Sequence, residues 1–129
     1  MGIDPGRSKT GLALADADGN IKKLRVAATS DLVDELTQFT QDAEIVHIII
    51  GNGTNSVNVE QIAEKVLPDL PLTEIKEAHS TEEARKLYWQ VNPPAGWRRI
   101  VPLGMLVPPV PLDAYAAVIL VRRYLAQNK

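Results

Sequence analysis

Residues 2–15 read GIDPGRSKTGLALA, and this stretch decides the first part of the fold. Residues 2–4 predict a short strand that stops at Pro5-Gly6, because this dipeptide is typical of turns. Residues 9–15 predict a second strand. The stretch therefore contributes two neighbouring strands joined by a short loop.

The remaining elements follow from turn signals and hydrophobic periodicity. Residues 17–20 (ADGN) form a turn signal before a third strand at 21–28, which completes an antiparallel meander. Two further strands are predicted at 45–50 and 72–77, and helices at 31–41, 56–67, 80–89 and 112–127. Ser30 is the expected N-cap of the first helix, and Ser80 with Glu83 matches a capping box at the third.

This order predicts an α/β fold in which a five-stranded mixed sheet is flanked by helices. The β-branched run IVHIII at 45–50 is typical of a strand buried on both faces in the parallel part of a sheet. No repeat or linker divides the chain, so residues 1–129 are expected to form one domain. The proline-rich segment 92–111 is a loop long enough to suggest a function.

The composition excludes several classes of protein. Of the 129 residues, 45% are hydrophobic and 23% are charged, which excludes a disordered or collagen-like chain. No cysteine is present, so disulfides and thiolate metal sites are excluded and a reducing cytoplasm is expected. No apolar run is long enough to span a membrane and MGIDPG does not resemble a signal peptide, so we expect no membrane partner.

The net charge of −2 conceals a strong charge asymmetry along the chain. Residues 1–83 carry 7 basic and 15 acidic side chains, whereas residues 84–129 carry 7 basic side chains and 1 acid, Asp113. Such an asymmetry favours contact with an anionic polymer such as a nucleic acid.

Three acids occupy positions that packing alone does not favour. Asp4 ends a central strand, Glu77 ends a later strand, and Asp113 lies on the apolar side of the first turn of the last helix. Each has an ordinary alternative role as a turn acceptor, an exposed strand end or a complement to the helix dipole. Strand ends and helix N-termini are also where α/β sheets assemble sites, and oxygen ligands without His or Cys suit Mg²⁺ or Mn²⁺.

Four short motifs, in order along the chain, resemble those of the YqgF-type, or RuvX-like, family of RNase H-fold nucleases. They are GIDPG with TGLA at 2–6 and 10–13, IIIGNGT at 48–54, Glu77 with STEEA at 80–84, and DAYAAVIL at 113–120. The GNGT part is especially similar to the corresponding domain of the transcription accessory protein Tex. The resemblance covers nearly the whole chain.

The resemblance implies an RNase H-like sheet in the strand order 3-2-1-4-5, with Asp4, Glu77 and Asp113 as catalytic and metal-binding acids. It implies phosphodiester hydrolysis with two Mg²⁺ or Mn²⁺ ions. The implied substrates are a Holliday junction or a ribosomal RNA precursor, and resolving a two-fold symmetric junction would favour a homodimer. The chain departs from the family at Ala78, where an arginine is expected, so a weakened or inactive enzyme stays open.

A second group of candidate residues could hold nucleic acid. Arg7 and Lys9 flank the first turn and could bind phosphates. Trp97, Arg98 and Arg99 lie in the proline-rich loop, where an aromatic ring can stack on an unpaired base and guanidinium groups can pair with phosphates. The alternative is that the tryptophan covers the core and the two arginines are solvated.

Two further features have ordinary structural explanations. Arg122 and Arg123 are expected on the solvated face of the last helix. Residues 51–54 (GNGT) could cradle a phosphate through backbone N–H groups, or form a tight strand-to-helix turn, and we favour the turn.

The sequence therefore supports three functions of different kinds. The first is a magnesium-dependent endonuclease acting on structured nucleic acid. The second is a non-catalytic, Tex-like module that binds nucleic acid or regulates, which Ala78 allows. The third is a phosphate-binding lobe similar to those of sugar kinases and actin-like ATPases, suggested by Asp4, Gly6, Ser8 and Thr10, although those proteins need two such lobes.

Overall fold

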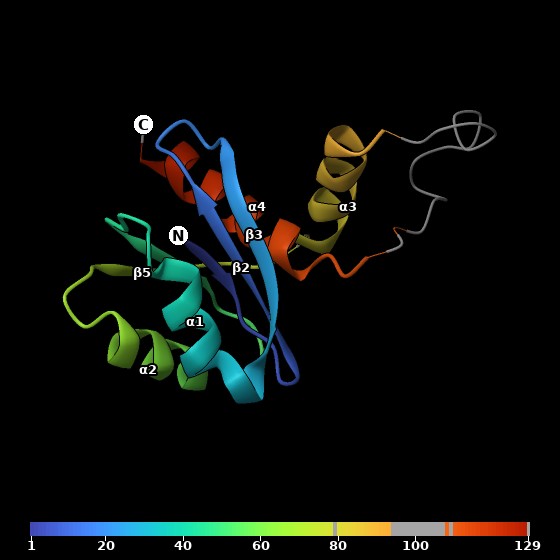
Figure 1. Ribbon diagram of the computed structural model, residues 1–129. Coiled ribbons are helices and arrows are strands. Elements are labelled where there is room, and N and C mark those ends of the chain that lie inside the picture. The colour runs from blue at the N-terminus through green and yellow to red at the C-terminus, as the bar shows by residue number, and fades with distance from the viewer. Residues whose placement is uncertain (79, 94–107, 109, 129) are drawn as a thin grey trace.

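Five strands form one mixed sheet in the order β3-β2-β1-β4-β5 (Figure 1). The structure is a computed structural model that describes residues 1–78, 80–93, 108 and 110–128. The strands are β1 (Gly2–Asp4), β2 (Lys9–Ala15), β3 (Ile21–Ala28), β4 (Ile48–Gly51) and β5 (Leu72–Ile75). The first three are antiparallel neighbours, whereas β4 runs parallel to both β1 and β5. The predicted α/β class, mixed sheet and strand order are confirmed, but the specific RNase H-like assignment is not.

Helices cover both faces of this sheet (Figure 1). On one face lie α1 (Leu32–Thr40) and α2 (Ser56–Val66), and on the other lies α4 (Asp113–Gln127), against which α3 (Ser80–Val91) packs. The short 3₁₀ turn η1 (Thr29–Asp31) leads into α1. Among the described residues, no helix has the length and apolar character needed to cross a membrane.

Strand β4 supplies side chains to the cores on both faces. Ile48 and Ile50 belong to the core beneath α1 and α2, whereas Ile49 packs with Leu120 of α4. This division follows from the alternation of side chains along a strand. The predicted burial on both faces is confirmed for residues 48–50 but not for 45–47, which lie before β4 and are partly or fully exposed.

Two glycines let α4 approach the middle of the sheet. A Cβ atom on Gly2 would overlap the carbonyl oxygen of Ala117, and one on Gly11 would overlap that of Asp113. Ala116 and Ala117 are themselves buried and small. The backbone of α4 therefore lies directly on β1 and β2, and its first residue, Asp113, is carried to the sheet.

The two parallel strands are shorter than predicted. β4 begins at Ile48 rather than at residue 45, because its pairing partner β1 has only three residues and Gly2 is paired with Ile49. Val46, just before β4, is 74% exposed. β5 ends at Ile75 rather than at residue 77, since Ile75 is paired with Gly51, the last residue of β4.

The helix boundaries also differ at their ends. Ser30 is not the N-cap of α1, because the chain forms the η1 turn first, and the neighbouring Thr29 is the residue that anchors it. The hydroxyl of Thr29 is hydrogen-bonded to Thr10 Oγ1 at 2.8 Å and donates to the carbonyl of Gly6 at 2.9 Å. α3 extends to Val91, two residues beyond the predicted end, and α4 begins one residue later than predicted.

Candidate functional site

Three carboxyl groups meet at one end of the sheet. Asp4 is the last residue of β1, Glu77 follows β5 by two residues, and Asp113 is the first residue of α4. A side-chain hydrogen bond joins Asp4 to Glu77, and Asp113 is near enough to act on Asp4 by its charge. The structure thus brings together the three acids singled out in the sequence.

Asp4 is the group most affected by this arrangement. Burial, the hydrogen bond to Glu77 and the negative charges of Glu77 and Asp113 together raise the pKa of Asp4 to about 8, and burial has the largest effect. A carboxyl group with this pKa keeps its proton at neutral pH. The Asp4 carboxyl can therefore donate a hydrogen bond to Glu77.

The loop after β4 is shaped around Glu77. A Cβ atom on Gly51 or on Gly53 would overlap the Glu77 carboxylate, so both positions have room only for glycine. The Glu77 N–H donates to Asn52 Oδ1 at 3.1 Å, and the Asn52 N–H donates to the Ile75 carbonyl at 3.0 Å. Residues 51–53 therefore hold Glu77 in place, which explains the glycines without a bound phosphate.

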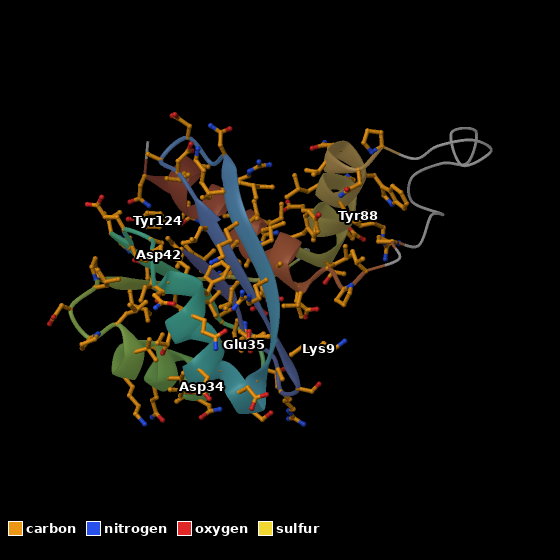
Figure 2. All side chains as sticks on the ribbon, viewed as in Figure 1. Lys9, Asp34, Glu35, Asp42, Tyr88 and Tyr124 are labelled. Carbon is orange, nitrogen blue, oxygen red and sulfur yellow. The ribbon has the colours of Figure 1, made fainter. Side chains whose placement is uncertain are left out.

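A second part of the site is the loop between β1 and β2. The carbonyl of Gly6 accepts hydrogen bonds from Thr29 Oγ1 at 2.9 Å and from Asn55 Nδ2 at 3.1 Å, and the carbonyl of Ser8 accepts one from the Thr29 N–H at 2.9 Å. These bonds fix the backbone of the loop. Its side chains at residues 7–9 are exposed, and Lys9 extends away from the rest of the molecule (Figure 2).

The same loop lies next to the N-terminus of α2. Asn55, the N-cap of α2, has a left-handed backbone (φ 70°) and makes no side-chain cap hydrogen bond, because its amide donates to Gly6 instead. No acid lies in the first turn of α2. The partial positive charge of this helix end is therefore not neutralised by an acid of its own first turn.

The sequence predicts a metal-binding role for the three acids. Within the described part of the chain, no group of three or more His, Cys, Asp or Glu side chains is arranged so that it could hold a metal ion. Residues Asp4, Glu77 and Asp113 as placed do not form a ligand set, and binding of Mg²⁺ or Mn²⁺ there stays a prediction.

Arg123 is a residue of the site that the sequence analysis missed. Its guanidinium group donates to the carbonyls of Lys76 at 2.7 Å and Ala78 at 2.6 Å, the two residues that flank Glu77, and to Glu83 Oε2 at 2.9 Å. The expected solvated position of Arg123 is therefore wrong. Helical spacing places Arg123 three residues after the buried Leu120, and this was the signal in the sequence.

One other prediction is corrected by these contacts. Glu83 does not form the predicted capping box with Ser80, because its carboxylate is paired with Arg123 and the Ser80 N–H donates to the Glu77 carbonyl at 2.9 Å. Arg122 is exposed, as predicted, and its Nε also donates to the Gly19 carbonyl at 3.1 Å, which anchors the turn between β2 and β3. The predicted nucleic-acid-binding residues Trp97, Arg98 and Arg99 lie outside the described residues.

Comparisons with known proteins give little. No family model matches the chain, and no curated protein matches it. Among solved structures, a match is the crystal structure of a ROK family transcriptional regulator, a homologue of the E. coli MLC protein, with 14% sequence identity and a TM-score of 0.47. The match covers 67% of this chain and 30% of the regulator, so this chain spans less than a third of that protein.

These findings contradict the family inferred from the short motifs. The predicted YqgF-type nuclease, whether a Holliday junction resolvase or an rRNA-processing enzyme, is matched by no family model. The physical reason is that the motifs have structural explanations. Gly2 and Gly11 are required by the approach of α4, and Gly51 and Gly53 by Glu77. The nuclease identification is therefore corrected.

Proposed function

We propose that this chain is a non-catalytic module that binds the phosphate backbone of a nucleic acid. The observation that carries the proposal is the loop between β1 and β2. Its backbone is fixed by hydrogen bonds, while Arg7 and Lys9 are exposed and form no ion pair with any described residue. Cationic side chains on an anchored loop bind phosphate with little ordering cost at the backbone.

The groups around this loop suit a phosphate. A guanidinium group such as that of Arg7 can bind two phosphate oxygens at once, and Lys9 adds a compact positive charge. The N-terminus of α2 lies against the same loop through the Asn55–Gly6 hydrogen bond, and helix N-termini favour anions. These elements converge on one edge of the sheet.

The acids behind the loop do not oppose this function at neutral pH. Because burial and the neighbouring Glu77 and Asp113 raise the pKa of Asp4 to about 8, Asp4 is neutral at pH 7, and the cluster carries one negative charge fewer than its three carboxyls could supply. The proton on Asp4 thus removes one negative charge that a bound cation would otherwise have to balance. We expect phosphate binding to weaken above pH 8, when Asp4 ionises.

A polymer of phosphates accounts for the sequence better than a single nucleotide. The loop presents two exposed cationic side chains, Arg7 and Lys9, and successive phosphates of one strand could pair with both. A nucleotide-binding lobe of the sugar-kinase or actin-like kind would use the same loop but needs a second lobe. We place the nucleic-acid-binding module in the cytoplasm, which the absence of cysteine favours.

The test is binding of labelled single strands, duplexes and four-way junctions, measured by fluorescence anisotropy with Mg²⁺ or with EDTA. We expect the double variant Arg7→Ala/Lys9→Ala to bind about tenfold more weakly or worse at low salt. The matched control is Lys65→Ala/Lys86→Ala, which removes two exposed positive charges elsewhere. The control should change the affinity by less than about twofold.

Each other outcome has a definite meaning. Equal affinity of wild type and the Arg7/Lys9 variant would place the binding surface elsewhere and overturn the proposal. Saturable binding of ATP with no binding of any nucleic acid would favour the nucleotide-binding lobe. Metal-dependent shortening of the labelled strands, seen on a gel after the same incubation, would show that the module is not merely a binding one.

A further inference from the structure

Arg123 makes an unusually complete set of contacts for a side chain at the surface. Its side chain is 21% exposed, and its three guanidinium nitrogens make four hydrogen bonds. Two of them go to the carbonyls of Lys76 and Ala78, and two go to the carboxylate of Glu83. The positive charge is thus countered by Glu83, and the fork of donors is directed at the backbone.

Four hydrogen bonds, two of them from Arg123, satisfy the backbone polar groups of Glu77 and the carbonyls of its two neighbours. The carbonyls on either side of Glu77 accept from Arg123. The Glu77 N–H donates to Asn52, and the Glu77 carbonyl accepts from the Ser80 N–H. Glu77 lies outside any regular strand or helix, so it has no sheet or helix hydrogen bonds. These side-chain and turn contacts satisfy its backbone groups instead.

The contacts form a continuous path from α4 to the loop between β1 and β2. Arg123 holds the segment that carries Glu77, and Glu77 packs against Gly51 and Gly53. The chain then continues to Asn55, whose side chain donates to Gly6. Each step is a hydrogen bond, a direct contact or a short covalent connection.

We propose that Arg123 is the positioning residue of the site, which fixes the backbone of Glu77 and through it the loop after β4. Its effect on the Glu77 backbone stands by itself, whereas its effect on ligand binding rests on the proposed function. An arginine is required because one guanidinium group reaches both flanking carbonyls and Glu83 together. A lysine has a single nitrogen and cannot reproduce this geometry.

The experiment compares three variants of the full chain: Arg123→Met, Arg123→Lys and Arg122→Met. The last is a matched control, because Arg122 is the neighbouring arginine of the same helix and also donates to a backbone carbonyl, that of Gly19. Amide hydrogen exchange followed by NMR reports on the Glu77 and Ser80 N–H groups without any ligand. Affinity for the labelled strand is measured in parallel.

We expect Arg123→Met to accelerate exchange at Glu77 and Ser80 by about tenfold or more while leaving Ile49 in the central sheet much less affected. Arg123→Lys should give the same acceleration although it keeps the charge. Arg122→Met should accelerate exchange at Gly19 and leave Glu77 unchanged. If the proposed function holds, both Arg123 variants should also weaken strand binding by about tenfold, and Arg122→Met should not.

The proposal is overturned if Glu77 exchange is unchanged in Arg123→Met, if lysine restores the wild-type rate, or if Arg122→Met accelerates Glu77 as much. A uniform acceleration of all amides in Arg123→Met, Ile49 included, would show only a general loss of stability and would also overturn it. Should the wild type bind no nucleic acid, the proposed function fails while the exchange data still decide the role of Arg123.

Discussion

At the scale of single residues, Asp4 is the group with the largest consequence. It ends the central strand β1, next to the carboxyl groups of Glu77 and Asp113. Its placement at a strand end was clear from the sequence, because Pro5-Gly6 must stop the strand. The proton that it retains was not, since this depends on burial and on two acids that are distant in the chain.

The first prediction concerns stability and pH. Burial and the neighbouring acids raise the pKa of Asp4 from its ordinary value of 3.8 to about 8 in the folded state, so the native protein binds this proton more tightly than the unfolded chain does. Its contribution is therefore present in full below about pH 4 and is lost as the pH rises to about 8. We expect this group to lower the free energy of unfolding by up to about 1.4 kcal/mol per pH unit within that window.

Urea unfolding between about pH 5 and 8 measures this slope in the wild type and in Asp4→Asn, because this range lies between the pKa values of Asp4 in the unfolded and folded states. Asparagine has a similar size and can still donate to Glu77, but it does not titrate. We expect the variant to lose the downward slope. A variant with the same slope as the wild type would show that other groups, and not Asp4, cause the pH dependence.

Arg123 illustrates the limit of sequence reasoning at this scale. The position of a residue on a helix face follows from its spacing, but its partners do not. The carbonyls of Lys76 and Ala78 are 47 and 45 residues away in the chain, and only the packing of α4 across the sheet brings them within reach. The three acids could be found because Asp4 ends a strand, Asp113 begins a helix and Glu77 follows shortly after a strand, whereas Arg123 lies within a helix.

At the scale of elements, the contact between α4 and the sheet positions Asp113. The existence of each strand and helix followed from periodicity and turn residues, whereas the strand order was given only by the resemblance of the motifs to a known fold. The ends of β4 and β5 did not, because a parallel ladder stops where the shorter partner stops, and β1 has only three residues. Gly2 on β1 and Gly11 on β2 indicated that another element packs closely there, but the sequence did not show that this element is α4.

The second prediction follows from Gly11. A Cβ atom there would overlap the backbone of Asp113, which cannot move without displacing the start of α4. We expect Gly11→Ala to lower the free energy of unfolding by about 3 kcal/mol. Thermal and urea unfolding would measure the loss. Lys9→Ala, at the exposed start of the same strand, is the control and should change stability by less than about 0.5 kcal/mol.

The same pair of variants separates folding from binding. Lys9→Ala should weaken nucleic-acid binding without loss of stability. Gly11→Ala should lower stability but leave binding unchanged under conditions in which the protein is still folded. If Gly11→Ala proves as stable as the wild type, then α4 does not lie on β2 as closely as the structure shows.

At the scale of the whole molecule, the charge asymmetry of the sequence overstates the binding surface. Of the basic residues after Glu83, Arg122 and Arg123 use their guanidinium groups to hold backbone carbonyls of the protein itself. Before Glu83, in the acidic part, Arg7 and Lys9 are exposed on an anchored loop. A count of charges along the chain does not distinguish these two uses, because it contains no information about contacts.

The last prediction turns this distinction into a measurement. Each phosphate contact made by a cationic side chain releases counter-ions, so the slope of log K against log salt becomes less steep by up to about 0.9 for each contact removed. We expect Arg7→Ala/Lys9→Ala to reduce the slope by up to about 1.8, because both charges face the ligand. Arg123→Met removes a charge that is already paired with Glu83, so it should weaken binding at every salt concentration while leaving the slope unchanged. A reduced slope in Arg123→Met would mean that this arginine contacts phosphate directly, and its contacts with Lys76 and Ala78 would then be an alternative to ligand binding rather than a support for it.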